Sequence, residues 1–390
     1  MESAELARHF EEVFGVVPRI FSAPGRVNLI GEHTDYNDGF VMPSAIGSHT
    51  RVAIARRWDD KLVLHSLNFP ERFEFEANHL PRQRLGAWCD YVLGVAVELR
   101  EIGHPPRGAS LIVDGNVPIG AGLSSSAAIE VASALAFLSL IEARIDLPEV
   151  AKLCQRAENS FVGAHVGIMD QFVSCLGRAG HALLLDCRSL EYKLIPVPDQ
   201  VRMVICNTMV KHELKEGEYN LRRRQCEQGV KILSEWVPGV RALRDLSADQ
   251  VEQHRDALPD VIYRRCMHVV QENQRVLDGA QCLENGELRK FGELMGESHR
   301  SLRDLYEVSC SELDVMVELA SPLAGCYGAR MTGGGFGGCT INLVNAGDAL
   351  AFAAEISERY QEKTGIKPDV YISAAVDGAA ASAGLHPVTV

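Results

Sequence analysis

The sequence predicts an α+β fold made of two domains. Apolar runs of strand length and helical periodicities occur in both halves of the chain. The 390 residues, 46% of them hydrophobic, are enough to build two sizeable cores. A Pro-Val-Pro-Asp segment at residues 196–199 interrupts the pattern. We therefore expect one domain over residues 1–200 and a second over residues 201–390.

The first domain is expected to be rich in strands. Residues 109–113 form a short apolar run typical of a buried strand, and residues 72–75 alternate between polar and apolar side chains. Ile129, Val131 and Leu135 recur at helical spacing among alanines, which favours a helix over 124–138. In all, the patterns predict strands at 51–55, 61–64, 72–75, 109–113 and 181–186, and helices at 88–102, 124–138, 147–160 and 167–175.

The second domain is expected to combine a short sheet with many helices. A strand is predicted at residues 201–206, directly after the break. Residues 216–320 then carry abundant charge in mostly helical patterns. The chain returns to a strand at 339–344, a helix at 349–360 and a strand at 369–374.

Composition excludes several classes of protein. A formal net charge of -13 argues against nucleic acid as the main partner. No apolar run is long enough to span a bilayer, and the polar first residues do not resemble a signal peptide. The 11 cysteines form no C-x-x-C pair, so we expect reduced thiols in a cytoplasmic protein, without a disulfide or zinc framework.

The most informative segment reads Pro-Ile-Gly-Ala-Gly-Leu-Ser-Ser-Ser-Ala over residues 118–127, between a predicted strand and a predicted helix. Its glycines let the backbone approach a ligand closely. Its serines add hydroxyls and free N–H groups where the helix dipole is positive. Such a helix terminus binds anions, phosphate above all. The alternative is a Gly/Ser turn that only caps the helix.

A second segment, residues 23–36, reads Ala-Pro-Gly-Arg-Val-Asn-Leu-Ile-Gly-Glu-His-Thr-Asp-Tyr. Glycine and proline punctuate it so often that we expect no single regular element there. Carboxylates spaced like Glu32 and Asp35 suit a ligand with several hydroxyl groups, because each oxygen accepts hydrogen bonds. An ordinary polar surface loop is the alternative, but apolar Val27, Leu29 and Ile30 are interleaved with the charges.

A third segment, residues 331–340, reads Met-Thr-Gly-Gly-Gly-Phe-Gly-Gly-Cys-Thr. Gly333, Gly335 and Gly338 formally fit the dinucleotide pattern G-x-G-x-x-G, but a strand rather than a helix follows them. Such a loop can brace another loop or a ligand, or serve only as a turn between two strands. The sequence contains neither the P-loop signature nor the protein-kinase motifs, which excludes both classes.

Together and in this order, the three segments resemble the signatures of the GHMP small-molecule kinases, and residues 25–36 resemble the signature of the galactokinase family within them. Residues 157–161, 167–172 and 218–226 are similar to galactokinase segments as well, so the resemblance covers essentially the whole chain. It implies an N-terminal domain like domain 2 of ribosomal protein S5, a ferredoxin-like C-terminal domain and an active site between them. It also implies Mg²⁺-dependent transfer of the ATP γ-phosphate to the anomeric hydroxyl of galactose.

The resemblance implies a role for individual residues. Asp170 would be the catalytic carboxylate, and Arg26 would stabilise charge beside it. The positions implied to line the sugar site are Glu32, His33, Thr34, Asp35, Gly167, Asp170 and Tyr219. The positions implied to hold the nucleotide are Gly120, Ala121, Gly122, Leu123, Ser124, Ser125 and Ser126 around the phosphates, and Trp88 and Tyr91 near adenine. Ser126 and Glu158 would hold Mg²⁺. Taken alone, Asp170, Glu158 and Tyr219 would be ordinary helix residues.

Two other functions stay open at this point. One is a related kinase acting on N-acetylgalactosamine or on a sugar acid such as galacturonate. The other is a catalytically silent sugar sensor, which is disfavoured because Arg26, Asp170 and Ser124–Ser126 are all intact. An NAD-binding enzyme is rejected because residues 120–125 lack the third glycine. The expected partners are galactose and ATP, without nucleic acid or membrane; the oligomeric state stays open, and a monomer is compatible with the sequence.

Overall fold

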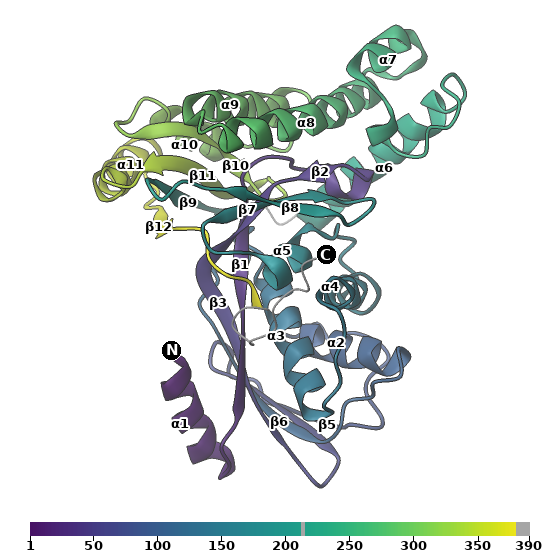
Figure 1. Cartoon of the computed structure of the whole chain (residues 1–390), viewed down its shortest axis with the longest axis vertical. Helices are drawn as coiled ribbons and strands as arrows, with labels where there is room; N and C mark the ends of the chain where they lie inside the picture. Colours follow the sequence, from purple (N-terminus) through teal and green to yellow (C-terminus); the bar gives the residue numbers. More distant parts are fainter. Residues whose placement is uncertain (212–214, 380–390) are drawn as a thin grey trace.

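The computed structural model describes residues 1–211 and 215–379, in which helices cover three sheets (Figure 1). The first sheet has the strand order β1 (Arg19–Asn28), β3 (Pro43–Arg56), β6 (Ala109–Gly115), β4 (Lys61–Ser66) and β5 (Phe73–Glu76). Neighbouring strands are antiparallel, except for the parallel pair β4 and β6. This mixed sheet forms the lower part of the molecule in Figure 1.

Helices cover both faces of this sheet. One face carries α2 (Asp90–Glu101), α3 (Ser125–Leu140), α4 (Leu147–Arg156) with its π-helical continuation Ala157–Val162, and α5 (Met169–Leu176) (Figure 1). The alanine-rich α3 packs directly against β1 and β3. The other face carries α1 (Ser3–Phe14), whose buried Leu6 and Phe10 contact Ala53 and Ile112. The first core therefore lies between the sheet and α2–α5.

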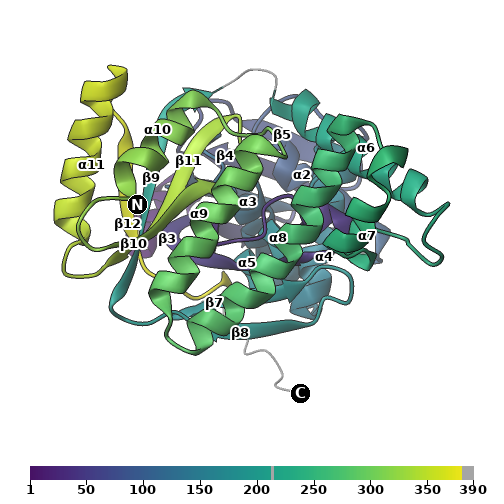
Figure 2. The same ribbon diagram turned by 90° about the horizontal axis from the view of Figure 1, so that it is seen from above.

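The second large sheet is antiparallel and belongs to the C-terminal half. Its order is β10 (Cys326–Thr332), β11 (Gly337–Asn345), β9 (Val201–Lys211) and β12 (Asp369–Ser373). The helices of this half are α6 (Lys215–Leu233), α7 (Ala248–Gln253), α8 (Asp260–Glu284), α9 (Leu288–Asp304), α10 (Ser311–Ala320) and α11 (Ala349–Thr364). Helices α8 and α9 lie side by side above the sheets (Figures 1 and 2). Single 3₁₀ turns occur at Asp35–Asn37, Leu243–Asp245 and Arg255–Ala257.

A third, small sheet joins the two halves. It consists of β2 (Phe40–Val41), β7 (His181–Asp186) and β8 (Tyr192–Pro196), and α8 packs against β2 and β8. The apolar residues of the second motif, Val27, Leu29 and Ile30, are fully buried here against Val276 and Phe291 of the C-terminal half. These anchors fix the polar loop that follows β1 against both halves of the chain.

Most predicted elements are confirmed, with shifted ends. The helix predicted from residue 88 begins at Asp90, because the Asp90 carboxylate accepts N–H groups of the preceding turn at residues 85–87. As expected, no single regular element spans residues 23–36: β1 continues to Asn28 through a register shift between Pro24 and Arg26, and a 3₁₀ turn begins at Asp35. The sequence patterns missed α1, β2, β8 and β10.

Two expectations from composition can be compared with the structure. All eleven cysteines are free thiols, as expected. Across residues 1–211 and 215–379, no helix combines the length and the apolar character that crossing a bilayer requires.

Candidate active site

Arg26 and Asp170 form the centre of the site. Arg26 lies on β1 and Asp170 in the first turn of α5, 144 residues later. The guanidinium donates from Nε to Oδ1 at 2.8 Å and from Nη2 to Oδ2 at 2.7 Å. Such a paired geometry is stronger and more directional than a single contact. The third guanidinium nitrogen, Nη1, donates to the carbonyl oxygen of Gly122 at 2.6 Å, so one side chain joins β1, α5 and the glycine-serine segment.

The glycine-serine segment forms the loop between β6 and the N-terminus of α3. Gly120 and Gly122 adopt positive φ angles of 70° and 81°, which glycine tolerates. Ser124 has a φ of 61°, unusual for a residue with a side chain, and its hydroxyl donates to Oδ2 of Asp170. The first backbone N–H groups of α3 lack partners within the helix and can donate hydrogen bonds to an anion. Part of the predicted phosphate loop is therefore tied to the catalytic carboxylate predicted from the sequence.

A cavity of about 150 Å³ adjoins this pair, and we call it the central cavity. Both halves of the chain contribute to its wall, which consists of Arg26, Glu32, His33, Asp35, Val166, Gly167, Met169, Asp170, Tyr219, Gly333 and Gly334. It is far larger than the space of about 10–15 Å³ that one water needs. The structure thus brings together every predicted sugar-site residue except Thr34. The Thr34 hydroxyl lies 2.8 Å from the Gly31 carbonyl oxygen and 2.7 Å from that of Phe40, so it shapes the loop instead.

Asp35 and Gly167 are in direct contact across the cavity wall. A Cβ atom placed on Gly167 would lie 1.7 Å from Oδ2 of Asp35, so only glycine fits there. Burial, together with the charge of Asp170, raises the pKa of Asp35 to about 7. Hydroxyl groups that donate hydrogen bonds to this carboxylate therefore stabilise its ionised form.

His33 is held as a neutral ring. Burial and the neighbouring His268 lower its pKa to about 3. Its Nδ1 lies 2.7 Å from the Tyr36 hydroxyl, which in turn lies 2.8 Å from that of Tyr306. The ring also contacts Tyr219 of α6, with centroids 5.4 Å apart. Sequence reasoning missed Tyr306, because its place in the chain gave no signal that its ring lies against His33, with centroids 4.8 Å apart.

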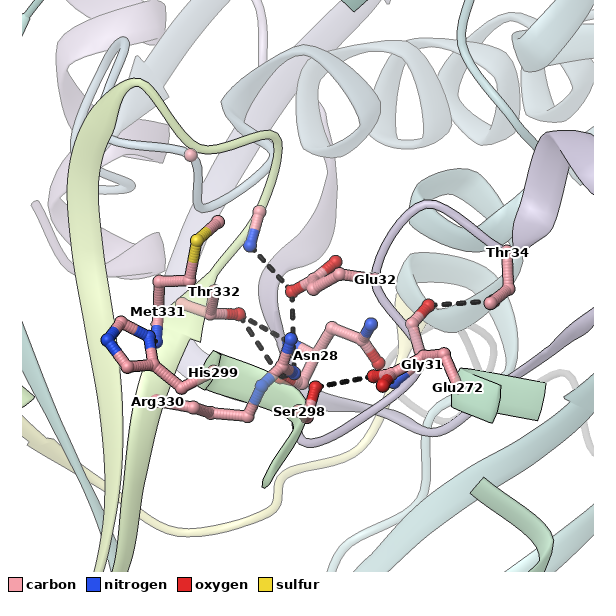
Figure 3. A network of polar contacts seen from close by, with 12 residues as sticks. Asn28, Gly31, Glu32, Thr34, Glu272, Ser298, His299, Arg330, Met331 and Thr332 are labelled. Carbon is pink, nitrogen blue, oxygen red and sulfur yellow. Dashed lines mark hydrogen bonds and ion pairs between the residues drawn. The ribbon is translucent and has the colours of Figure 1, made fainter. Parts of the chain in front are cut away.

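Glu32 is anchored from the C-terminal half. Its Oε1 accepts the backbone N–H of Gly333 at 2.7 Å and lies 3.7 Å from Nη1 of Arg330 (Figure 3). Burial raises the pKa of Glu32, and the charges of Arg330 and Arg26 act against this rise. Sequence reasoning missed Arg330, which precedes the third motif by one residue and is fully buried.

The third motif (residues 331–340) packs against the first (residues 118–127). This is one of the two alternatives that the sequence left open for the third motif. Gly333 has a φ of 84°, and a Cβ on it would lie 2.9 Å from the carbonyl oxygen of Gly122. Gly120, Gly122 and residues 334–337 line a second hollow of about 240 Å³ beside the central cavity. Close approach of two glycine-rich backbones thus forms part of the wall between these spaces.

Ser126 and Glu158 lie together near the start of α3. The Glu158 carboxylate makes hydrogen bonds with the Ser126 hydroxyl and with Nε2 of Gln171, the latter at 2.6 Å. Gln171 also donates to Oε2 of the fully buried Glu130 at 3.1 Å. Burial raises the pKa of Glu158 to about 7. An added cation would favour its ionised form, so the donor set suits Mg²⁺, which takes few protein oxygens and completes its shell with phosphates and water.

No cluster of three or more His, Cys, Asp or Glu side chains suited to a metal occurs in the part of the chain that the structure describes. A metal bound here would therefore depend on ligands from the substrate as well as the protein.

Trp88 and Tyr91 lie in a separate pocket of about 280 Å³, which also contains Ser125 and Ser126. The Trp88 indole donates to the carbonyl oxygen of Glu71 at 3.2 Å, which fixes the ring. Sequence reasoning missed the other apolar walls of this pocket, Phe69, Val117 and Ile119. A largely apolar pocket that ends at a helix N-terminus fits a nucleotide base with its phosphates directed toward that terminus.

The chain is similar to known proteins over most of its length. Family models match three parts of the chain: a galactokinase galactose-binding signature at residues 8–56, the GHMP kinases N-terminal domain at 90–178 and the GHMP kinases C-terminal domain at 280–362. A galactokinase of Roseiflexus sp. (strain RS-1) is 45% identical over 97% of both chains. A galactokinase of Chloroflexus aggregans is 49% identical over 91% of this chain and 92% of its own.

Solved structures show the same relationship. Lactococcus lactis galactokinase complexed with galactose superposes with a TM-score of 0.93 at 36% identity, covering 96% of this chain and 98% of its own. A mevalonate kinase with 17% identity and a TM-score of 0.66 covers 92% of this chain and shares the fold. The expected two-domain GHMP kinase fold is therefore confirmed.

Proposed function

Because the chain belongs to the galactokinase family of the GHMP kinases, we propose that it transfers the γ-phosphate of ATP to the anomeric hydroxyl of galactose. The products are galactose 1-phosphate and ADP. The observation that carries the proposal is the position of the central cavity. Its wall contains the Arg26–Asp170 pair, and that pair is hydrogen-bonded to the loop at the N-terminus of α3.

Phosphoryl transfer depends on alignment and on neutralising oxygen charge more than on covalent help from the protein. Asp170 accepts a hydrogen bond from the attacking hydroxyl and can take its proton. Arg26 and the helix N-terminus stabilise negative charge on the transferred group. The hydrogen bonds that fix Arg26 before substrate binds leave little reorganisation for the reaction step.

The remaining residues bind and orient the substrates. Glu32 and Asp35 accept hydrogen bonds from sugar hydroxyls, and Tyr219 closes the cavity from the C-terminal half. Trp88 and Tyr91 flank the adenine. Ser126 and Glu158 would hold Mg²⁺, which when bound neutralises phosphate charge. The cavity then lies between domains 1–200 and 201–390.

A coupled ADP-release assay with purified protein, MgATP and a panel of sugars tests the proposal. Galactose should be turned over much faster than glucose, talose, N-acetylgalactosamine and galacturonate. Faster turnover of N-acetylgalactosamine or galacturonate would assign a related kinase. Galactose binding without any ADP release would indicate a sensor and contradict the proposed reaction.

A further inference from the structure

Arg330 is a fully buried arginine whose own hydrogen bonds are incomplete. It lies on β10, next to the third motif, with no exposed surface. Its Nη1 donates to the Asn28 carbonyl oxygen at 3.1 Å, but Nε and Nη2 have no hydrogen-bond partner among the described residues. A buried guanidinium with unpaired N–H groups is costly, so its presence calls for an explanation beyond packing.

Two buried carboxylates, those of Glu32 and Glu272, lie near this guanidinium (Figure 3). Glu272 of α8 has partners of its own, since it accepts from Gly31 N at 2.9 Å, Ser298 Oγ at 2.5 Å and Arg275 Nε at 2.7 Å. Glu32 lies 3.7 Å from Arg330 Nη1 and makes no ion pair with another arginine in the described residues. Arg330 is therefore the nearest cation for Glu32, whereas Glu272 has Arg275 as well.

Glu32 faces two sites at once. Its Oε1 accepts the Gly333 N–H at 2.7 Å, and its second oxygen points away from this contact (Figure 3). The same side chain lines the central cavity. Gly333 in turn abuts the backbone of Gly122 in the loop before α3. A continuous chain of contacts thus leads from the central cavity through Glu32 and Gly333 to the phosphate loop.

The strand end that carries Arg330 is fixed by further hydrogen bonds. Thr332 Oγ1 accepts the Asn28 N–H at 3.0 Å and donates to the Asn28 carbonyl oxygen at 3.2 Å, while Met331 N donates to His299 Nδ1 at 3.3 Å. Arg330 therefore approaches Glu32 from a rigid position. A rigid partner can orient a carboxylate without contacting the ligand itself.

From this arrangement we infer that Arg330 is a positioning residue: it holds Glu32 so that sugar binding in the central cavity and nucleotide binding at the phosphate loop strengthen each other. The inference rests on the proposed function for the identity of the two ligands. Such coupling is reciprocal. Galactose must therefore raise the affinity for MgADP by the same factor by which MgADP raises the affinity for galactose.

Calorimetric titration of galactose and of MgADP, each alone and in the presence of the other, measures this factor. The proteins are wild type, Arg330→Met, Arg330→Lys, Glu32→Gln and the double variant Glu32→Gln/Arg330→Met. Glutamine keeps an acceptor for Gly333 but removes the charge. Arg265→Met is the matched control, because Arg265 is also buried but bonds to Gln225, Leu305 and Glu307 instead.

In wild type we expect a coupling factor of about fivefold or more. Arg330→Met should bring the coupling factor close to one. It should also weaken galactose binding by about tenfold or more, because the charged Glu32 loses its orienting partner. In the Glu32→Gln background, Arg330→Met should weaken galactose binding by less than about twofold. Arg330→Lys, which keeps the charge, should restore part of the coupling, and Arg265→Met should retain all of it.

The inference is overturned if Arg330→Met weakens galactose binding equally in the wild-type and Glu32→Gln backgrounds. It is also overturned if the coupling factor is unchanged in Arg330→Met. If Arg330→Met does not fold, Glu32→Gln decides, because its coupling factor must also fall toward one. Failure of the proposed function gives a different result: the wild-type protein would release no ADP from MgATP in the presence of galactose, whether or not the titrations detect galactose binding.

Discussion

The guanidinium of Arg26 donates to both carboxylate oxygens of Asp170, at 2.8 and 2.7 Å, and at the same time to the Gly122 carbonyl oxygen at 2.6 Å. The Ser124 hydroxyl donates to the same carboxylate. The residue that would activate the sugar hydroxyl is thus linked to the loop that would bind the phosphates. Arg26 and Asp170 should therefore act as one unit in the proposed reaction.

Replacing Asp170 with asparagine should lower kcat by about 10²-fold or more, because the amide can neither take the proton nor pair with Arg26 in the same way. MgADP affinity should change little, since Asp170 lies on the wall of the central cavity. Arg26→Ala should also lower kcat, and the double variant should be far less impaired than the product of the two effects predicts. Steady-state kinetics of the three variants measures this; near-normal turnover of Asp170→Asn would refute the assigned role.

Replacing Glu158 with glutamine should raise the Mg²⁺ concentration that gives half-maximal rate. The carboxylate is the single charged oxygen that the protein is proposed to offer this ion, next to the neutral Ser126 hydroxyl. The control is Glu149→Gln, an exposed carboxylate on the neighbouring α4 that pairs with Lys152. A Mg²⁺ titration that is the same for Glu158→Gln and wild type would leave Glu158 with a structural role only. EDTA should abolish activity, and Mg²⁺ should restore it without zinc.

Gly167→Ala should raise the KM for galactose strongly, by about tenfold or more, because the new methyl group must displace Asp35 from the cavity wall. The KM for ATP should change much less. Gly47→Ala is the matched control, since a Cβ there meets only Ser373 Oγ at an ordinary 3.7 Å. Comparable galactose KM values for the two alanine variants would show that the Asp35–Gly167 contact does not shape the sugar site.

The sequence was sufficient for the fold class and for the motif residues that the structure brings together at the central cavity, but it could not reveal partners that tertiary packing supplies. Ser124 is predicted to contact phosphate, and the structure adds a contact that the sequence did not indicate, because its hydroxyl donates to Asp170 in the first turn of α5. Glu130 reads as a polar helix residue, but it is fully buried beside Gln171. Arg330 carried no signal in the sequence, in which β10 was not predicted, and only the contact of β10 with Asn28 at the end of β1 makes it the neighbour of Glu32.

Local signals also failed where strands are short. A two-residue strand such as β2 has no periodicity to detect, and its existence depends on pairing with β7. Thr34 shows the same limit within the site, because its neighbours in the sequence face the cavity while its own hydroxyl bonds to the loop backbone.

The raised pKa of Asp35 predicts a pH dependence of stability. Burial raises this pKa from about 3.9 in the unfolded chain to about 7 in the folded protein. The folded state then binds more protons between these values, so the free energy of unfolding contributed by this group falls as the pH rises from about 4 to 7. Asp35→Asn lacks this titration. Because the cavity admits solvent, we expect the difference to be about 1–2 kcal/mol.

Urea unfolding of the sugar-free protein at pH 5 and pH 8 measures this difference. The loss of unfolding free energy between the two pH values should be smaller in Asp35→Asn than in wild type. Saturating galactose should also reduce the loss in wild type, because sugar hydroxyls that donate to Asp35 stabilise its ionised form. An identical loss in both proteins would show that Asp35 does not titrate in this range.

Asp35 should also set the choice between galactose and glucose. We expect it to accept hydrogen bonds from two neighbouring ring hydroxyls, including the axial one at C4 of galactose. Glucose turns that hydroxyl equatorial, and 4-deoxygalactose lacks it, so in both cases a partly buried carboxylate loses a donor. Sites built around one hydroxyl can discriminate by about 10⁴ in kcat/KM.

Both glucose and 4-deoxygalactose should therefore be very poor substrates, whereas 2-deoxygalactose, which keeps both contacts, should still be phosphorylated. In Asp35→Ala the gap between galactose and glucose should shrink, chiefly through loss of activity on galactose. Wild-type kcat/KM values for glucose close to those for galactose would contradict both the role of Asp35 and the proposed substrate.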